Sequence, residues 1–590
     1  MQRLLSDRQV IRDGMRMIFD APIPVDDGVT LRADVFLPEQ EGRYPVILSY
    51  GPYAKGLSFQ EGYPDQWNRM VQQHPDVAAG STNTYQSWEV VDPEKWCPHG
   101  YACVRVDSRG AGSSPGFVEP WSPRETKDFG ACIEWAGTQP WSSGKVGLNG
   151  ISYYAMNQWM VASLEQPKHL AAMCAWEGAS DFYREFAYHG GVLSTFLGNW
   201  FDMQVKTVQN GLGERGAKSP VTGRPACGDV TLSDSELAKN RCDLGADVLA
   251  HPLADDYHKA RTPKWDRLTV PFLSAGNWGG AGLHLRGNVE AFVRAASSQK
   301  WLELHGIEHW THFYTDYGRE LQKRFFDYFL KGEQNGWDGE RRVHLNIRHV
   351  DRFEERYEDE WPIARTNWTR FYLHPDGKTL SKVPPSSGGD LVYEALGDGL
   401  TFTSAPLDEQ TEITGPSATK LWLSSSTRDA DVFAVLRAFA PSGEEVVFQG
   451  AIDPHTPIAQ GWLRASHRKL DPKLTREYRP FHTHDVEQPL VPGAPVELDV
   501  EIWPTCIVLP RGYRLAVTIR GKDYVYPGGS GGKIKSFKNE LTGCGPFIHD
   551  DPRNRPHDVF GGKNTIHITA GKPAYVLLPV IPPVSSRAQR

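Results

Sequence analysis

Short apolar runs alternate with amphipathic stretches along the chain up to residue 344. The apolar runs are typical of strands buried on both faces, and they fall at 44–50, 101–107, 146–148, 170–176, 270–276 and 300–306. The stretches between them favour helices, several with apolar residues at helical spacing, notably 125–138, 155–162, 283–297 and 316–331. Strands that alternate with helices predict an α/β fold with a mainly parallel sheet.

Two regions break this pattern. Residues 180–262 mix aromatic residues, glycines and charges, with helix-like segments at 233–241 and 252–261. From residue 345 to the end, strand-like alternation is separated by repeated proline and glycine turns, which predicts an all-β domain, most simply a jelly-roll sandwich. We therefore expect an α/β domain built from 1–179 and 263–344, an insertion at 180–262 and a β domain at 345–590.

Bulk composition narrows the class of partner. A chain of 590 residues is too long for one hydrophobic core, so several domains are expected. The net charge of −8 and the lack of a long basic run favour a small-molecule partner over nucleic acid or membrane, and leave a homo-oligomer open. No signal peptide and no apolar run of about 18 residues is recognisable, which predicts a cytoplasmic protein. The eight cysteines are scattered without a Cys-x-x-Cys pair, so we predict neither a metal nor a cofactor.

One serine lies at a turn between a strand and a helix. The strand at 146–148 runs into Gly150-Ile-Ser152, and a helix-forming run follows directly. In a nucleophile elbow such a turn lifts the hydroxyl clear of the sheet, while N–H groups of the new helix, that of Tyr153 among them, face a developing oxyanion. Ser152 is therefore the predicted nucleophile, although Tyr154 replaces the second glycine of the usual Gly-x-Ser-x-Gly motif.

Several motifs together resemble the cocaine esterase and X-prolyl dipeptidyl-peptidase family of serine hydrolases. They include Gln139-Pro-Trp before the elbow, Gly150-x-Ser-Tyr within it, Pro52-Tyr-x-Lys, Asp107-x-Arg-Gly, and the segments 424–432, 461–465 and 502–515 near the C-terminus. The resemblance implies an α/β-hydrolase fold with a helical cap at 180–262 and a C-terminal jelly-roll domain. It also implies that Tyr53 lines the oxyanion hole through its hydroxyl.

The resemblance also suggests a catalytic base. Trp310-Thr-His312 matches the family's Trp-x-His motif, so His312 is the predicted base. Two extra residues after Gly306 keep His309 as the alternative and His305 as a more distant one.

The acid of the triad is the open point. The family places an aspartate in the loop after the 270–276 strand, where this chain has Gly279. Glu177 follows the strand after the nucleophile helix, so it should emerge at the same edge of the sheet as Ser152. We therefore predict that Glu177 accepts a hydrogen bond from Nδ1 of His312. Glu308 is the rival, and the absence of any acid stays an alternative.

The predicted activity is hydrolysis of an ester or amide bond of a small to medium acyl substrate through an acyl-enzyme on Ser152. One alternative is an acyltransferase or a lyase of secondary metabolism on the same scaffold. The missing loop aspartate also leaves open a binding protein without catalysis.

Overall fold

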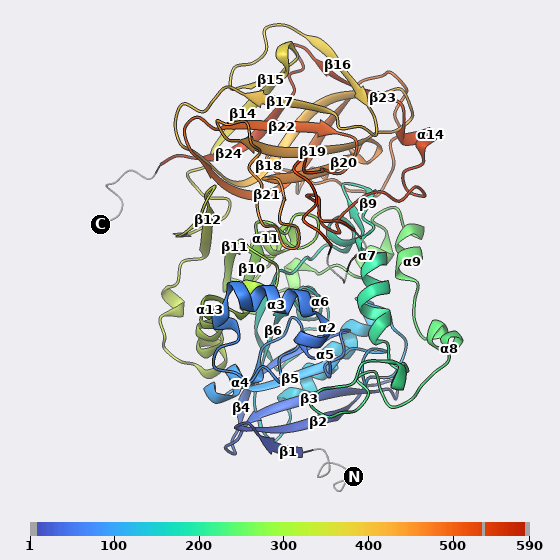
Figure 1. The fold of residues 1–590 in the computed structure, drawn as a ribbon, viewed down its shortest axis with the longest axis vertical. Coiled ribbons are helices and arrows are strands. Elements are labelled where there is room, and N and C mark those ends of the chain that lie inside the picture. The colour runs from blue at the N-terminus through green and yellow to red at the C-terminus, as the bar shows by residue number, and fades with distance from the viewer. Residues whose placement is uncertain (1–8, 534–536, 538, 584–590) are drawn as a thin grey trace.

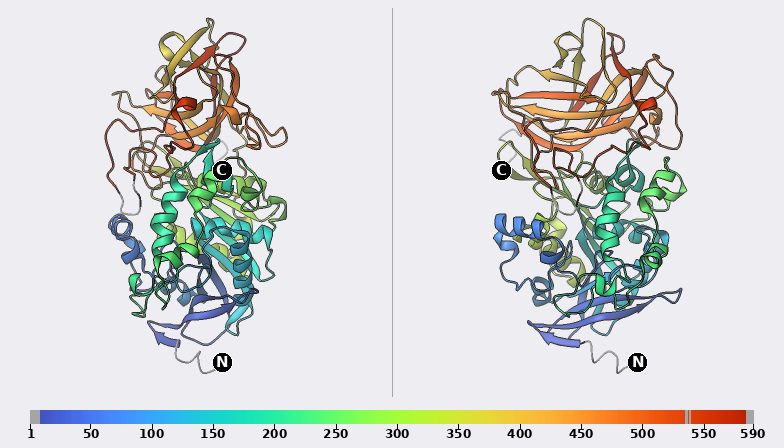
Figure 2. Two further views of the ribbon diagram at one scale, coloured as in Figure 1. Left: turned by 90° about the vertical axis from the view of Figure 1, so that its right-hand side faces the viewer. Right: turned by 45° about the vertical axis from the view of Figure 1, so that its right-hand side comes forward.

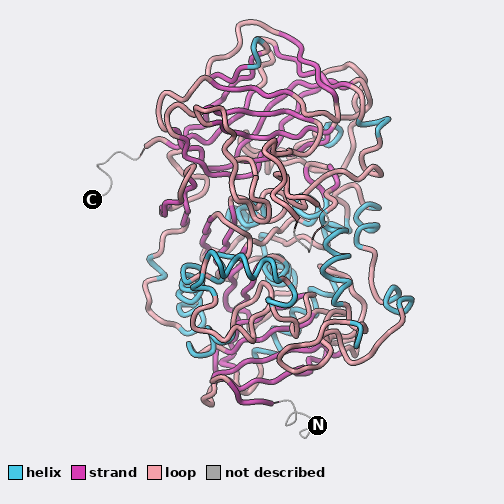
Figure 3. The backbone as a smooth tube through the Cα atoms, viewed as in Figure 1, coloured by secondary structure: helices cyan, strands magenta, loops and turns pink. Residues whose placement is uncertain are grey.

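The computed structural model describes residues 9–533, 537 and 539–583, and it shows two lobes stacked along the long axis of the molecule (Figure 1). The lower lobe holds the N-terminal strands and most of the helices, and the upper lobe consists of strands and loops with little helix (Figure 3). In this part of the chain the strands form two 11-stranded sheets and one short hairpin. No described helix is long and apolar enough to cross a lipid bilayer.

The lower lobe is built on a mixed sheet. Its strands run parallel from β5 to β12 and antiparallel at both edges. This confirms the predicted α/β class, although the sheet continues past the predicted boundary at residue 344, with one strand that crosses it and one strand beyond it. From edge to edge the strands are β1 (Gln9–Arg12), β2 (Met15–Pro24), β3 (Thr30–Pro38), β5 (Ala102–Asp107), β4 (Tyr44–Gly51), β6 (Ser142–Ile151), β7 (Leu170–Trp176), β10 (Phe272–Asn277), β11 (Lys300–His305), β12 (Val343–Arg348) and β13 (Phe353–Glu358).

Apolar side chains on both faces of this sheet form separate cores. Along β4, Val46 and Leu48 pack on one side and Ile47 on the other, because successive side chains of a strand point to opposite faces. The continuous apolar runs of the central strands therefore follow from burial on both faces. The main helices are α5 (Pro123–Gly137), α6 (Tyr153–Leu164), α11 (Leu285–Arg294) and α13 (Asp316–Phe326).

The chain between β7 and β10 leaves the sheet and forms short helices on one flank of the molecule (Figure 2). The helix-like segments predicted at 233–241 and 252–261 are present as shorter helices, whereas the aromatic helix α7 was not anticipated. The helices of four or more residues here are η3 (Phe182–Ala187), α7 (Phe196–Trp200), η4 (Phe201–Val205), α8 (Asp234–Lys239), α9 (Leu244–Ala250) and α10 (Asp256–Lys259).

The upper lobe confirms the predicted C-terminal β domain. Pairing of β24 with β18 closes nine of the described strands into a barrel, and β23 and β16 extend it from β18. Its strands are β14 (Asn367–His374), β15 (Thr379–Ser381), β16 (Gly389–Glu394), β17 (Leu400–Ser404), β18 (Thr411–Ser425), β19 (Asp431–Phe439), β20 (Ala459–Arg464), β21 (Val496–Leu509), β22 (Arg514–Arg520), β23 (Lys563–Ile568) and β24 (Tyr575–Ile581).

Candidate active site

Ser152 occupies the turn between β6 and α6. Its backbone has φ 56° and ψ −115°, a conformation that costs energy in a residue with a side chain and that is common at functional sites. Its N–H donates to the Trp176 carbonyl at 3.1 Å, which ties the turn to the neighbouring strand β7. A Cβ at Gly150 would lie 2.4 Å from Cβ of Tyr154, so only glycine fits beneath the turn. This is the geometry predicted for a nucleophile elbow.

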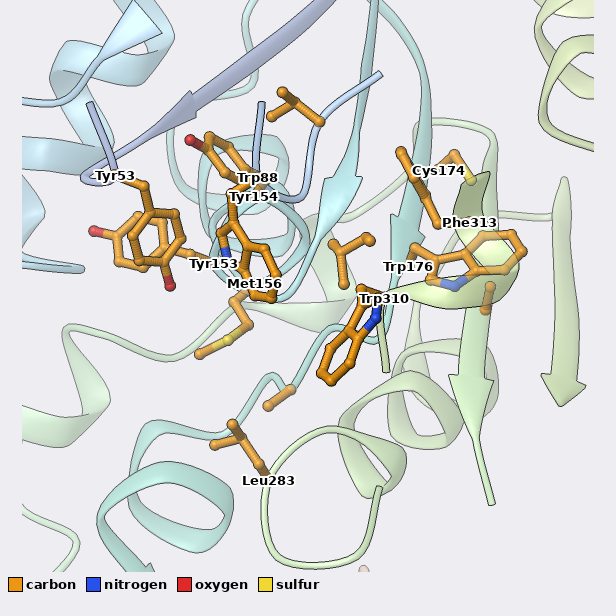
Figure 4. Packing of buried hydrophobic residues seen from close by; sticks show 14 of the residues in the cluster. Tyr53, Trp88, Tyr153, Tyr154, Met156, Cys174, Trp176, Leu283, Trp310 and Phe313 are labelled. Carbon is orange, nitrogen blue, oxygen red and sulfur yellow. The ribbon is translucent and has the colours of Figure 1, made fainter. Parts of the chain in front are cut away.

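Ser152 opens into a pocket with mainly aromatic walls. Figure 4 shows Tyr53, Tyr153 and Met156 close together, with Trp88 and Trp310 further along the same cluster. Most of the residues that line this pocket are aromatic or aliphatic, as is typical of sites that bind apolar substrates. The lining residues are Tyr53, Gln66, Trp88, Glu89, Trp121, Ser152, Tyr153, Met156, Phe196, Leu197, Trp200, Gln204, Leu283, His284, His309, Trp310, Ala451, Ile452, Phe537 and Phe547.

The histidine in contact with the serine is His284, which sequence analysis did not select. Its Nε2 lies 3.2 Å from Ser152 Oγ, and it immediately precedes α11, at the carboxyl end of the sheet. Its Nδ1 receives the Ala179 backbone N–H at 3.4 Å. Burial, followed by the nearby His309 ring, holds the pKa of His284 well below its ordinary value, so the ring is neutral at pH 7.

A second histidine stacks on the first. The rings of His284 and His309 are parallel within 8°, and their centroids are 5.1 Å apart. His309 lies between two carboxylates: Nδ1 is 2.8 Å from Glu177 Oε2, and Nε2 is 2.8 Å from Glu89 Oε1. Burial opposes protonation, but the charges of Glu177 and Glu89 and their hydrogen bonds to the ring together outweigh it and raise the pKa of His309 to about 10. His309 is therefore an imidazolium at pH 7.

Glu177 emerges directly after β7, beside the elbow as predicted from chain order. Burial would raise its pKa, yet the charge of His309 and the hydrogen bonds from His305 and His309 lower it to about 2. Its Oε1 also receives Asn277 Nδ2 at 3.2 Å and faces His305 Nε2 at 3.4 Å. Both oxygens of this carboxylate are thus occupied.

The predicted hydrogen bond between His312 and Glu177 is wrong. His312 lies on α12 (Thr311–Tyr314), where its ring packs against His305 and Tyr317, and it does not line the pocket. Its Nδ1 makes no hydrogen bond to any described residue. The start of α12 at Thr311 turns this side chain away, so the loop residue His309 reaches Glu177 instead.

Neither Glu308 nor the loop at Gly279 supplies an acid to a histidine of the pocket. Glu308 forms no ion pair with a histidine within the described part of the chain, and its backbone carbonyl accepts the Thr311 N–H. A Cβ at Gly279 would lie 2.3 Å from Cα of Gly450, so an aspartate has no room in this loop. The backbone of Gly279 instead accepts the Ala451 N–H at 3.0 Å, which joins the loop to the upper lobe.

Two tyrosines predicted for the oxyanion hole lie near the serine. The Tyr53 hydroxyl accepts the indole N–H of Trp200 at 3.0 Å, and its ring packs edge-on against Tyr153. The Tyr153 hydroxyl is committed to Glu125 Oε2 at 2.5 Å, which leaves only its backbone N–H for an oxyanion. Tyr53 therefore has a hydroxyl proton to offer the pocket.

Sequence reasoning missed His284 and Glu89, although weak signals existed. Glu89 lies in the long loop-rich segment 56–95, and long loops in compact domains are often functional. His284 lies at the start of the helix predicted at 283–297, after a strand that points to the same edge as the elbow.

The chain is similar to known hydrolases over most of its length. Residues 27–314 match the X-Pro dipeptidyl-peptidase (S15) family, and residues 335–577 match the non-catalytic C-terminal domain of X-Pro dipeptidyl-peptidases. A crystal structure of a CocE/NonD family hydrolase from Staphylococcus aureus superposes with a TM-score of 0.81 at 31% identity, covering 96% of this chain and 94% of that one. The cocaine esterase of a Rhodococcus species is 24% identical over 95% of this chain and 97% of its own length. A protein named as a serine esterase in Mycobacterium bovis is 26% identical over 89% and 92%, respectively.

Proposed function

The chain belongs to the CocE/NonD family of serine hydrolases, and we propose that it cleaves an ester or amide bond of a small to medium acyl substrate through an acyl-enzyme on Ser152. The observation that carries this proposal is the contact of 3.2 Å between Ser152 Oγ and a neutral histidine at the base of an aromatic pocket. A serine hydroxyl becomes nucleophilic when an adjacent base takes its proton.

We assign the role of base to His284. In the reactive tautomer, Nδ1 carries the proton and Nε2 accepts the Ser152 proton as Oγ attacks the carbonyl carbon. This tautomer gives up the contact from Ala179 N–H to Nδ1, which at 3.4 Å is a long and weak hydrogen bond. The charge of His309 beside it is balanced by Glu177, so a proton on His284 does not face an unpaired cation.

The oxyanion would be bound by donors of different origin. The Tyr153 N–H belongs to the first turn of α6, where helix N–H groups have no partner inside the helix. The Tyr53 hydroxyl is oriented by the indole of Trp200, which donates to its oxygen and leaves its proton for the substrate. Preorganised donors of this kind stabilise the tetrahedral intermediate.

We propose that the insertion 180–262 acts as a cap and that the C-terminal barrel, predicted as a jelly roll, buttresses the site. Phe196, Leu197 and Trp200 from the insertion line the pocket, as do Ala451 and Phe547 from the C-terminal lobe. These walls favour apolar or aromatic acyl groups and limit their size. Because β12 and β13 belong to the first sheet, we place the boundary of the last domain between 358 and 367.

The test is covalent labelling by a fluorophosphonate, together with a screen of p-nitrophenyl esters and aminoacyl anilides of graded size. We expect labelling of the wild type, no labelling of Ser152→Ala, and a burst of nitrophenol from esters that fit the pocket. A folded wild-type protein that is neither labelled nor active would favour a binding protein instead. Preferential transfer of the acyl group to an added alcohol would favour an acyltransferase.

A further inference from the structure

A chain of five buried ionisable groups ends in the pocket beside Ser152. Carboxylates and imidazoles alternate along it, and each of the five side chains is at most 7% exposed. The order is Glu303, His305, Glu177, His309, Glu89, with contacts of 2.6, 3.4, 2.8 and 2.8 Å between successive groups.

The carboxylates of this chain differ in how their oxygens are used. Glu303 and Glu177 each have hydrogen-bond partners on both oxygens. Glu89 uses Oε1 for His309, whereas Oε2 makes no hydrogen bond of normal geometry to any described residue. The indole N–H of Trp88, equally unpaired, is close enough to favour the ionised carboxyl. A buried carboxyl oxygen without a partner is costly, which points to a role in the reaction.

The backbone holds Glu89 beside the elbow. Its carbonyl accepts the Ile151 N–H at 3.0 Å, and its own φ is 63°. Ser152 and Glu177 also have positive φ, at 56° and 51°. Such conformations are uncommon for residues with a side chain and persist only where the surrounding structure imposes them. Glu89 is therefore positioned as firmly as the proposed nucleophile.

We propose that Glu89 is a catalytic acid and base of this hydrolase: its carboxyl protonates the departing alcohol or amine in acylation and takes a proton from the attacking water in deacylation. This inference rests on the proposed function, because it needs an acyl-enzyme on Ser152. It divides between two groups the proton transfers that a single histidine performs in a standard triad.

The proton transfers balance over one turnover. In acylation, His284 takes the Ser152 proton, Oγ bonds to the carbonyl carbon, and the leaving oxygen or nitrogen departs with the proton of Glu89. In deacylation, water attacks the acyl carbon and gives a proton to the Glu89 carboxylate, while protonated His284 returns its proton to Oγ as the ester bond breaks. The products are the free acid and the alcohol or amine, and both residues are regenerated.

The surroundings suit Glu89 to this exchange. Burial raises the pKa of Glu89, and the hydrogen bond and the charge of His309 oppose burial only in part, so that the pKa of Glu89 is about 7. The charge of Glu177, which follows β7, raises the pKa of Glu89 further. The other ionisable groups that face Glu89 are tyrosines, which are neutral at pH 7: Tyr53, Tyr63, Tyr154 and Tyr314. A general acid works best when its pKa is near the working pH. Once ionised, the carboxylate stays paired with the His309 imidazolium.

The experiment compares leaving groups in Glu89→Gln. This substitution keeps an acceptor oxygen for His309 but removes the transferable proton. For an ethyl ester, whose alkoxide needs protonation, we expect kcat/KM to fall by about 10² to 10⁴. For the p-nitrophenyl ester of the same acid, whose phenolate leaves without help, acylation should fall by less than about 10-fold. Glu125→Gln is the matched control, because Glu125 is also buried with a pKa of about 7 but lies outside the pocket lining.

The wild type gives an independent readout that needs no variant to fold. Because Glu89 must be protonated for acylation, kcat/KM for the ethyl ester should fall above about pH 7, and that for the p-nitrophenyl ester should not. Equal loss for both leaving groups in Glu89→Gln, or identical alkaline limbs in the wild type, would overturn the proposal. Failure of the proposed function is distinguishable, since it would abolish fluorophosphonate labelling of the wild type.

Discussion

His284 and His309 are parallel, buried rings in one pocket, yet their partners differ completely. His284 contacts the Ser152 hydroxyl and has a backbone N–H on its other nitrogen, whereas His309 has a carboxylate on each nitrogen. Burial leaves His284 neutral, whereas Glu177 and Glu89 together keep His309 protonated against the same effect. The contacts that a triad assigns to one histidine are thus divided between two. The proposed nucleophile, Ser152, and the predicted acid, Glu177, therefore contact different histidines.

The division of these contacts between His284 and His309 has a steric origin. The loop after β10 comes so close to the upper lobe that no side chain fits at Gly279, and Gly450 fills the space of an aspartate. The same loop delivers His284 to the serine. The Ala451 carbonyl accepts the backbone N–H of His309 at 2.9 Å, so the upper lobe also holds the backbone that carries the second ring.

The largest expected effect separates the two rings. His284→Ala should lower kcat by about 10⁴ to 10⁶, as loss of a triad base does, because no other described group contacts the Ser152 hydroxyl. His309→Ala should lower kcat for activated esters much less, by about 10- to 10²-fold, because its ring contacts Glu89 and Glu177 and not the Ser152 hydroxyl. His312→Ala is the control for removing a buried histidine outside the pocket. Steady-state kinetics with p-nitrophenyl esters measure all three. Equal loss in His284→Ala and His312→Ala, or a greater loss in His309→Ala, would reverse the assignment.

The next largest effect tests the proposed oxyanion hole beside Ser152. Tyr53→Phe removes a hydroxyl that we place in the oxyanion hole and keeps the ring that packs on Tyr153. We expect kcat to fall by about 10²- to 10³-fold with little change in KM, because the donor acts on charge that develops in the transition state. An unchanged kcat would make Tyr53 a packing residue only.

A smaller effect tests how far the second ring supports the first. Glu177→Gln removes a negative charge that favours protonation of His284, so the imidazolium that forms on His284 during acylation is less stabilised. At an effective dielectric constant of about 20, the interaction of one neighbouring unit charge with protonated His284 is roughly 2 kcal/mol, which corresponds to about 30-fold in rate. The acidic limb of the pH profile should move as well. A variant with wild-type kcat and an unmoved profile would show that the two rings are uncoupled.

The smallest effect concerns stability at alkaline pH. The pKa of His309 is raised from 6.5 to about 10 in the folded protein. The ion pair with Glu177 therefore contributes its full stability below about pH 6.5 and loses it as the pH rises through 10. We expect the thermal midpoint of the wild type to fall more between pH 7 and 10 than that of Glu177→Gln. Other groups titrate equally in both proteins, so equal shifts would contradict the buried imidazolium.

Much of the fold could be predicted because it follows from local patterns. The apolar runs at 44–50, 170–176 and 300–306 are strands of one sheet, and the interruption after β7 and the change to β structure are visible in the alternation of the chain. The elbow was also readable, because Gly150 and Ser152 lie within one turn between a strand and a helix.

Local sequence thus determined that a serine is presented at the edge of an α/β sheet. Which histidine meets it was decided by tertiary structure, because the choice among His284, His309 and His312 depends on how two loops and a helix end at one sheet edge. It depends too on the approach of a second lobe at Gly279, which is encoded some 170 residues away in Gly450 and is invisible to any short motif. The role that we propose for Glu89 was hidden for the same reason, because burial, the His309 imidazolium and the charge of Glu177, all products of packing, set the pKa of its carboxyl.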